Sequence, residues 1–223
     1  GTGNLDHDVQ EVMNGSSTKG HRNYRAGWFS FLRQGIIKGG TANSDTHTLA
    51  IEVLGYPRTL VLGGHSLADF DRERFNADVR NGRMIGTNGP VLSVCLEDAA
   101  GDCHDPGLTP RGGERLNIAV AAAPWIPVSE IRIVVNGEVA RTITELASPS
   151  DPFGEDDLVR YEGSVELAEL ALTADSFIVV EAGVALWPAG DVDGDGLFDT
   201  TDNAGTGVVD AADNRPVVLV VDR

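Results

Sequence analysis

Residues 130–143 read EIRIVVNGEVARTI, two alternating β-branched runs on either side of Asn136-Gly137. Asn-Gly between such runs is the strongest short signal for a β-hairpin, because both turn positions need a positive φ. The same pattern recurs elsewhere in the chain, where short β-branched runs are separated by proline, glycine and aspartate. These runs cover residues 114–123, 164–170, 176–184 and 215–221. Several short strands at this spacing predict an antiparallel β-sandwich over residues 91–223.

Residues 1–90 contain both strand-like and helix-like patterns, which predicts α/β structure. Residues 9–13 alternate in polarity and end at an Asn-Gly turn, which predicts a strand. Residues 22–34 place Trp28, Phe31 and Leu32 at helical spacing before Gly35, which predicts an amphipathic helix with a glycine cap. Residues 67–81 predict a second helix with a sparser apolar face. We therefore expect two domains, 1–90 and 91–223.

The charge of the chain limits its partners. It has 34 acidic and 17 basic residues, for a formal net charge of −17. Such a field repels phosphate backbones and anionic lipids, so we expect no nucleic-acid partner and no membrane partner. No run of about 18 apolar residues occurs, so the sequence predicts no membrane-spanning helix.

Residues 191–202 read DVDGDGLFDTTD, an acidic loop with the spacing of calcium ligands. Carboxylates occupy positions 1, 3, 5, 9 and 12 of the loop, with a glycine at position 6 for the sharp turn. The predicted ligands are Asp191, Asp193, Asp195, Asp199 and Asp202, with the carbonyl oxygen of Leu197. Five carboxylates repel one another without a cation, so we expect a bound calcium ion with a structural role. The alternative is a solvated acidic turn.

The acidic loop resembles the repeats of dockerins and of thrombospondin type 3 repeats, where DxDGDGxxDxxDN recurs. The match extends to Asn203. Where EF-hands carry glutamate at position 12, this loop has Asp202, whose shorter arm reaches the ion through one oxygen. No helix is predicted on either side, so calcium is expected to hold the loop in one structure and not to drive the opening motion of a calcium sensor.

Cys95 and Cys103 flank a short polar segment and lie eight residues apart. Their spacing predicts a disulfide that closes a hairpin-like loop, worth about 2.5 kcal/mol in the chain-entropy model. Two free thiols are the alternative. A disulfide and a calcium loop together favour an extracytoplasmic location, periplasmic or secreted.

Residues 39–48 read GGTANSDTHT and present Asp45 and His47 two positions apart. At the end of an extended strand, both side chains point the same way. A carboxylate and an imidazole on one face suit zinc, manganese or iron. The alternative is a capping aspartate near a core histidine.

Five short segments occur in an order that resembles a known family. They are EVMNG (11–15), GWFSFLRQG (27–35), NSDTH (43–47), GYPRT (55–59) and NGRMIGTNGP (81–90). In this order they resemble the C-terminal part of a metallohydrolase of the PHP superfamily (polymerase and histidinol phosphatase), in the branch that includes the carbaryl hydrolases. The family's final metal motif, Ser-Asp-x-His at the end of a barrel strand, is matched by Ser44, Asp45 and His47. The resemblance implies an α/β plus all-β fold, in which the C-terminal part of a distorted α/β barrel precedes the β-sandwich.

The family's His-x-His and its other upstream ligands have no counterpart in this sequence. We therefore expect the chain to be the C-terminal portion of a longer protein, with its missing N-terminal portion as a partner. The resemblance implies that the parent splits a phosphoester, ester or carbamate of a small molecule with metal-activated water. This chain alone is expected to be inactive. His7 and His21 are interpreted as solvated loop histidines.

A rival interpretation is a secreted, calcium-stapled β-sandwich that binds carbohydrate or a surface without catalysis. Its stacking aromatics would come from Tyr24, Trp28, Tyr56 and Trp125, although Trp28 also fits a helix core. An inert structural domain is the third possibility. A His-x-His in the upstream gene sequence would favour the enzyme, and a signal peptide joined to Gly1 would favour the binding module.

Overall fold

The computed structural model describes residues 5–15, 18–48, 53–64, 66–172, 175–184 and 217–222, with only the backbone of residues 18–19 and 217–222. In the described parts the strands are β1 (Val9–Asn14), β2 (Gly39–Asn43), β3 (Arg58–Val61), β4 (Met84–Thr87), β5 (Val91–Glu97), β6 (Cys103–His104), β7 (Arg115–Ala121), β8 (Glu130–Val135), β9 (Glu138–Ile143), β10 (Val159–Glu166), β11 (Phe177–Gly183) and β12 (Val217–Asp222). The helices are α1 (Thr18–Arg33), α2 (Arg72–Arg80) and the 3-10 turn η1 (Leu167–Leu170).

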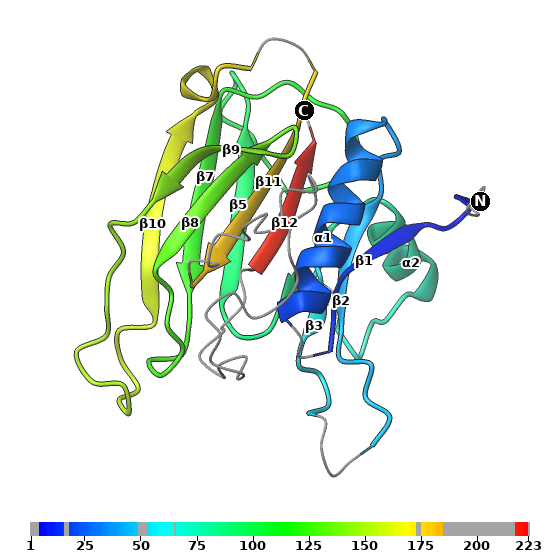
Figure 1. The fold of residues 1–223 in the computed structure, drawn as a ribbon. Helices are drawn as coiled ribbons and strands as arrows, with labels where there is room; N and C mark the ends of the chain where they lie inside the picture. The colour runs from blue at the N-terminus through cyan, green and yellow to red at the C-terminus, as the bar shows by residue number, and fades with distance from the viewer. Residues whose placement is uncertain are drawn as a thin grey trace, which may run out of the picture.

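Two antiparallel sheets form the larger part of the structure (Figure 1). One has four strands in the order β10-β7-β5-β6, and the other has six in the order β3-β4-β12-β11-β8-β9. Their inner faces share one apolar core, because alternate residues of each strand point inward. In β7, for example, Leu116, Ile118 and Val120 are buried while their neighbours are half-buried. The β-rich part of the fold prediction is therefore confirmed.

The six-stranded sheet is covered on its other face as well. Every residue of β11 is buried, which is expected of a strand with packed layers on both sides. One face of β11 contributes to the core between the sheets, and Phe177 and Val179 pack on the opposite side against Trp28, Phe29 and Leu32 of α1. The prediction for this helix placed Phe31 on its buried face. Phe31 is half-buried, and Phe29, the residue after Trp28, lies on the buried face instead.

The segment β1-α1-β2 is a strand, a helix and a second strand parallel to the first. It lies over the β3-β4 end of the six-stranded sheet (Figure 1), where β2 contacts both of those strands. Thr59 of β3 joins the two layers: its hydroxyl accepts from the Ala42 backbone N–H at 2.9 Å and donates to the Ala42 carbonyl at 2.8 Å. Parallel strands with a helical crossover are the α/β unit expected at this end of the chain.

A closed barrel is not present among the described residues, where β1 and β2 form a two-stranded sheet. The barrel portion of the fold prediction is therefore not shown. Strands on both sides of residue 90 share the six-stranded sheet, since β3 and β4 pair in it with strands that follow residue 90. The division at residue 90 stays a prediction. No described helix is long and apolar enough to cross a membrane.

Local turn signals predicted several element boundaries well. Asn136 and Gly137 have φ values of 53° and 89°, and they connect β8 to β9 as the Asn-Gly signal predicted. Gly35 ends α1 with a φ of 74°. The second helix was predicted too long: α2 spans only 72–80, because Asp71 caps it by accepting from the Glu73 and Arg74 backbone N–H groups.

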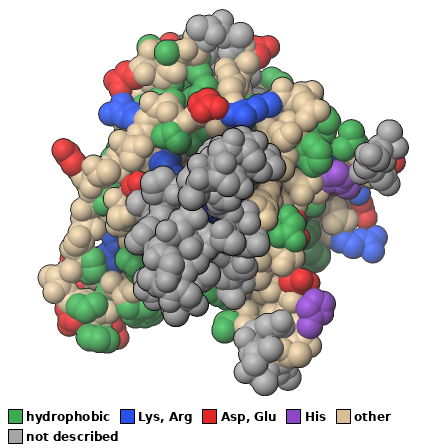
Figure 2. All heavy atoms as spheres, in the orientation of Figure 1, with side chains coloured by type: hydrophobic (Ala, Val, Ile, Leu, Met, Phe, Trp, Pro, Cys, Tyr) green, Lys and Arg blue, Asp and Glu red, His purple; other side chains and the backbone are tan. Residues whose placement is uncertain are grey.

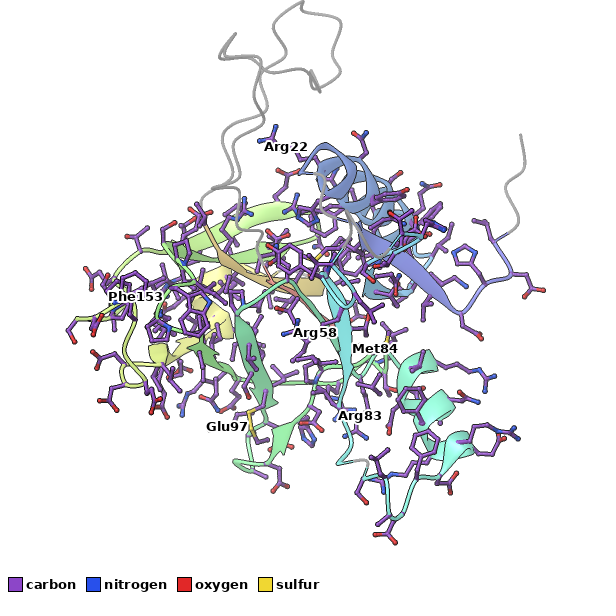
Figure 3. All side chains as sticks on the ribbon, turned by 90° about the horizontal axis from the view of Figure 1, so that it is seen from below. Arg22, Arg58, Arg83, Met84, Glu97 and Phe153 are labelled. Atoms are coloured by element: carbon purple, nitrogen blue, oxygen red, sulfur yellow. A yellow bond between two sulfur atoms is a disulfide. The ribbon has the colours of Figure 1, made fainter. Side chains whose placement is uncertain are left out.

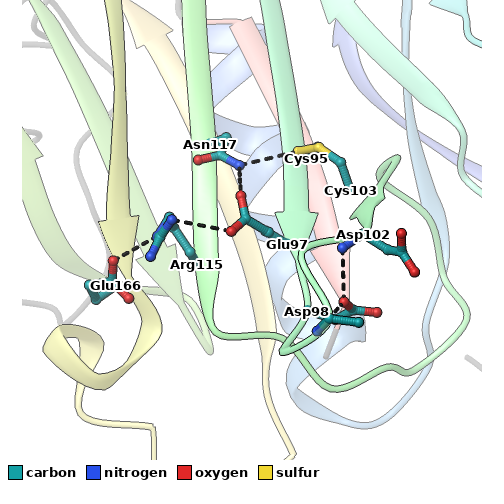
Figure 4. Close-up of polar contacts among 9 residues, drawn as sticks. Cys95, Glu97, Asp98, Asp102, Cys103, Arg115, Asn117 and Glu166 are labelled. Carbon is teal, nitrogen blue, oxygen red and sulfur yellow. Dashed lines mark hydrogen bonds and ion pairs between the residues drawn. A yellow bond between two sulfur atoms is a disulfide. The ribbon is translucent and has the colours of Figure 1, made fainter.

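Cys95 and Cys103 are joined by a disulfide, with their Cα atoms 5.6 Å apart. The bond connects β5 to the short strand β6 at the edge of the four-stranded sheet (Figure 4). The predicted pairing is confirmed. On the same outer face, Glu97 receives hydrogen bonds from Arg115 and Asn117, at 3.2 and 2.8 Å.

A buried ion-pair network fixes α1 to the sheet. Glu181, in the centre of β11, has no exposed side-chain surface and receives two hydrogen bonds from Arg25 of α1. Its cross-strand neighbour Arg132 lies 3.1 Å from the same carboxylate and also pairs with Glu130 at 3.2 Å. Two carboxylates and two guanidinium groups balance in charge, so the network meets the requirement that buried charges be paired.

Candidate functional site

Asp45 and His47 lie directly after β2 and contact each other. The His47 Nε2 atom is 3.0 Å from Asp45 Oδ1, and the two side chains are 73% and 51% exposed, respectively. Asp45 has a φ of 48°, a left-handed conformation that a short polar residue tolerates better than most. The strand end therefore presents an exposed carboxylate-imidazole pair, although Asp45 is not in the extended conformation that the Asp-x-His prediction assumed.

Further polar side chains gather at the carboxyl ends of β1 and β2. Because the strands are parallel, these ends meet at the same edge, and Asn14 and Asn43 are register partners there. The Glu11 carboxylate accepts from the Asn14 and Asn43 side-chain amides, at 3.0 and 2.8 Å. The sequence interpretation did not give Glu11 a role. The sequence did contain a signal for this contact. Glu11 belongs to a predicted strand that ends in Asn-Gly, and the Asn-Ser-Asp segment follows the next strand.

The described residues contain no group of three or more histidine, cysteine, aspartate or glutamate side chains able to hold a metal ion. Asp45 and His47 supply two donors of the right chemistry, an oxygen and an imidazole nitrogen. Metal binding at this pair stays a prediction.

The structure changes the expectation for His21 and bears out the helix-core interpretation of Trp28. His21 is not a solvated loop histidine: it lies in α1 and is 1% exposed, with Nδ1 at 3.2 Å from the Val12 carbonyl oxygen. The helix extends further toward the N-terminus than predicted and turns this side chain onto β1. Trp28 is fully buried, and its indole N–H donates to the Lys38 carbonyl at 2.8 Å, so it belongs to the core.

The predicted calcium loop lies outside the described residues. It spans Asp191–Asp202 and includes the predicted ligands Asp193, Asp195, Leu197 and Asp199. The structure describes the strands on either side of it. β11 and β12 are adjacent and antiparallel, with Ala182 opposite Val217, so residues 184–216 connect two neighbouring strand ends. β12 also pairs with β4, and it is the strand that links β3-β4 to the rest of the six-stranded sheet.

Asp98 and His104 form a second carboxylate-imidazole pair inside the disulfide-closed hairpin. The His104 Nε2 atom is 2.9 Å from Asp98 Oδ2. Asp98 Oδ1 accepts from the backbone N–H groups of Ala100 and Asp102, and Figure 4 shows the contact with Asp102. Every one of these contacts is local to the turn. The pair therefore shapes the hairpin, and the described part of the chain gives it no third donor that would make it a metal site.

The pKa of Asp98 is expected to lie below its ordinary value of 3.8, first because of the His104 hydrogen bond and then because of the Asp102 backbone N–H. A lowered folded-state pKa gives stability that is present above the ordinary value and is lost as the pH falls through the folded pKa. A carboxyl NMR titration measures this pKa directly. His104→Ala should move it upward toward 3.8, and a wild-type pKa at or above 3.8 would contradict the geometry.

Comparison with known proteins gives no relative from which a function could be inferred. No family model, no curated protein and no solved structure matches the chain. Function is therefore argued from the described geometry and from the sequence.

Proposed function

We propose that this chain carries part of the metal site of a metal-dependent hydrolase, at the carboxyl ends of β1 and β2. One observation carries the proposal: a parallel β1-α1-β2 unit ends in an exposed Asp45-His47 pair with 3.0 Å between donor and acceptor. Catalytic residues of α/β proteins gather at the carboxyl ends of parallel strands, where the loops are free to vary. The resemblance to the PHP superfamily supports the same position.

In this proposal Asp45 gives a carboxylate oxygen and His47 gives Nε2 to a zinc, manganese or iron ion. A bound ion of this kind supplies Lewis acidity and a water of lowered pKa, which suits hydrolysis of a phosphoester, ester or carbamate. Two donors are too few for a catalytic ion, which takes three or more protein ligands. The proposal therefore requires further ligands from outside the described residues. Glu11 keeps Asn43, two residues before Asp45, in place by the 2.8 Å hydrogen bond.

The β-sandwich is proposed to be an accessory part that calcium stabilises. The support is topological: the acidic segment connects β11 to β12, and β12 holds the two halves of the six-stranded sheet together. A hard cation coordinated by the carboxylates of residues 191–202 would fix the path of this long connection. An extracytoplasmic location is proposed with it, on the disulfide and the calcium loop.

The metal proposal is tested with the 223-residue chain alone and with the full reading frame. The chain alone should show no hydrolysis of a phosphodiester or an aryl ester with manganese or zinc. In the full-length protein, Asp45→Asn and His47→Ala should each lower activity by about 100-fold or more, because outer-shell changes alone cost about 10–100-fold. Both variants should also bind less zinc in calorimetric titration.

Asp156→Asn is a matched control, since Asp156 is exposed on the β9-β10 loop. It should leave activity and zinc binding unchanged. Activity of the chain alone that survives both Asp45→Asn and His47→Ala would place the active site elsewhere. An inactive, metal-loaded full-length protein would reject the hydrolase proposal.

A further inference from the structure

Two β-turns at one end of the sandwich have the same design. The first is Ala123-Pro124-Trp125-Ile126, closed by a hydrogen bond from the Ile126 N–H to the Ala123 carbonyl at 2.9 Å. The second is Asp151-Pro152-Phe153-Gly154, closed from Gly154 to Asp151 at 3.1 Å. In each turn, proline precedes an aromatic residue at the tip. Proline sets φ for the second turn position, so both turns are rigid before any ligand arrives.

Both aromatic side chains stand in solvent. Trp125 is 65% exposed and Phe153 is 89% exposed. The Phe153 backbone is held further by an N–H that donates to Asp151 Oδ1 at 2.8 Å. Large aromatic side chains on rigid, exposed turns lose little entropy on binding, and they are the residues that carry most binding energy in recognition surfaces.

A buried arginine joins the loops that carry the two turns. Arg160 of β10 is 2% exposed, and its Nη2 atom donates to the Ala123 carbonyl at 2.9 Å, while Nη1 donates to the Asp157 carbonyl. The backbone N–H of Ala122 also donates to the Leu158 carbonyl at 2.9 Å. The β7-β8 and β9-β10 loops therefore lie together at one end of the sandwich (Figure 1), and Phe153 stands at its outer edge (Figure 3). We call Trp125, Phe153 and the exposed carboxylates of the β9-β10 loop the aromatic-turn surface.

The charge around these rings narrows the choice of ligand. Residues 144–158 contain five carboxylates and no lysine or arginine: Glu145, Asp151, Glu155, Asp156 and Asp157. Hydrophobic and acidic side chains lie side by side at this lower left end of the molecule (Figure 2). Anionic polymers and anionic lipid surfaces would be repelled. A protein partner is disfavoured too, because protein interfaces are depleted in aspartate and glutamate.

We propose that the aromatic-turn surface binds a neutral polysaccharide. The apolar C–H faces of pyranose rings stack on Trp125 and Phe153, and sugar hydroxyls donate hydrogen bonds to the neighbouring carboxylates. Buried Arg160 ties the β7-β8 loop to the β9-β10 loop, so both rings are presented at the same end of the sandwich. The surface is separate from the Asp45-His47 pair, and the inference does not depend on the hydrolase proposal.

The test is a depletion assay of the full chain with microcrystalline cellulose, insoluble xylan and chitin. Wild-type protein should bind at least one of these polymers. Trp125→Ala and Phe153→Ala should each weaken that binding about tenfold, the change that corresponds to 1.4 kcal/mol, and the double variant should abolish it. Both positions are exposed, so thermal melting should show that the variants remain folded.

Tyr24→Ala is the matched control, since Tyr24 is an exposed aromatic residue on α1, 38% exposed and on a different face. It should bind like wild type, and Asp45→Asn should do so as well. Soluble polygalacturonate, an acidic polymer, should not bind. The proposal is overturned if none of the three neutral polymers is bound, if the aromatic variants bind like wild type, or if binding occurs only to polygalacturonate.

Discussion

Glu181→Ala is expected to destabilise the folded chain by about 3–5 kcal/mol, the usual cost of removing one partner of a buried ion pair. Glu181 has no exposed side-chain surface, and its carboxylate is the shared partner of Arg25 and Arg132. Without it, two guanidinium groups that are 20% and 15% exposed keep their charge in a largely desolvated site. Arg132 would retain Glu130, at 3.2 Å, so Arg25 should account for most of the loss.

Urea unfolding monitored by circular dichroism measures this change. The matched control is Asp8→Ala, which removes the 3.2 Å pair with Arg80, where both side chains are more than half exposed. An exposed pair is worth about 0–1 kcal/mol, so the control should unfold close to the wild-type midpoint. The variant Arg25→Ala, alone and combined with Glu181→Ala, gives the coupling between the two residues. A loss for Glu181→Ala no larger than for Asp8→Ala would show that water reaches the network.

Calcium is expected to raise the stability of the chain by about 2.7 kcal/mol at 100 times its Kd, because it binds the folded state alone. For a chain of this size the melting temperature should rise by about 5–10 °C. The reason lies in the sheet: residues 184–216 connect β11 to β12, and β12 joins β4 to β11. An ion bound at residues 191–202 would order the connection, and five repelling carboxylates without it would favour detachment of β12.

Calorimetric melting with calcium and with a chelator tests this effect. Asp193→Ala and Asp195→Ala should each abolish the rise, because each removes a predicted ligand. Asp45→Asn should keep the full rise, because that residue belongs to a separate site. A wild-type melting temperature unaffected by the chelator would leave residues 191–202 as a solvated turn.

Local signals in the sequence were sufficient for the elements whose cause is local. The Asn136-Gly137 turn follows from two neighbouring residues that accept positive φ, and the Cys95-Cys103 bond follows from an eight-residue spacing across a turn. The capping of α2 by Asp71 is just as local, yet the helix was predicted too long because its weak apolar pattern was extended back past the cap. The Asp45-His47 contact joins residues only two positions apart, but it forms with Asp45 at a φ of 48°, whereas the prediction assumed an extended strand end.

What the tertiary structure decided depends on residues far apart in the chain. Arg25 and Glu181 are 156 positions apart, and the sequence showed only one glutamate in an otherwise apolar run, FIVVEAG. Three other features are likewise long-range: the pairing of β12 with β4, the packing of α1 on β11, and the hydrogen bond from Arg160 of β10 to the β7-β8 loop. Alternation tells which side chains share a face, but it does not tell what will cover that face. The element that covers a face is determined by the packing of complete layers, in which apolar area is buried and buried charges are paired at the same time.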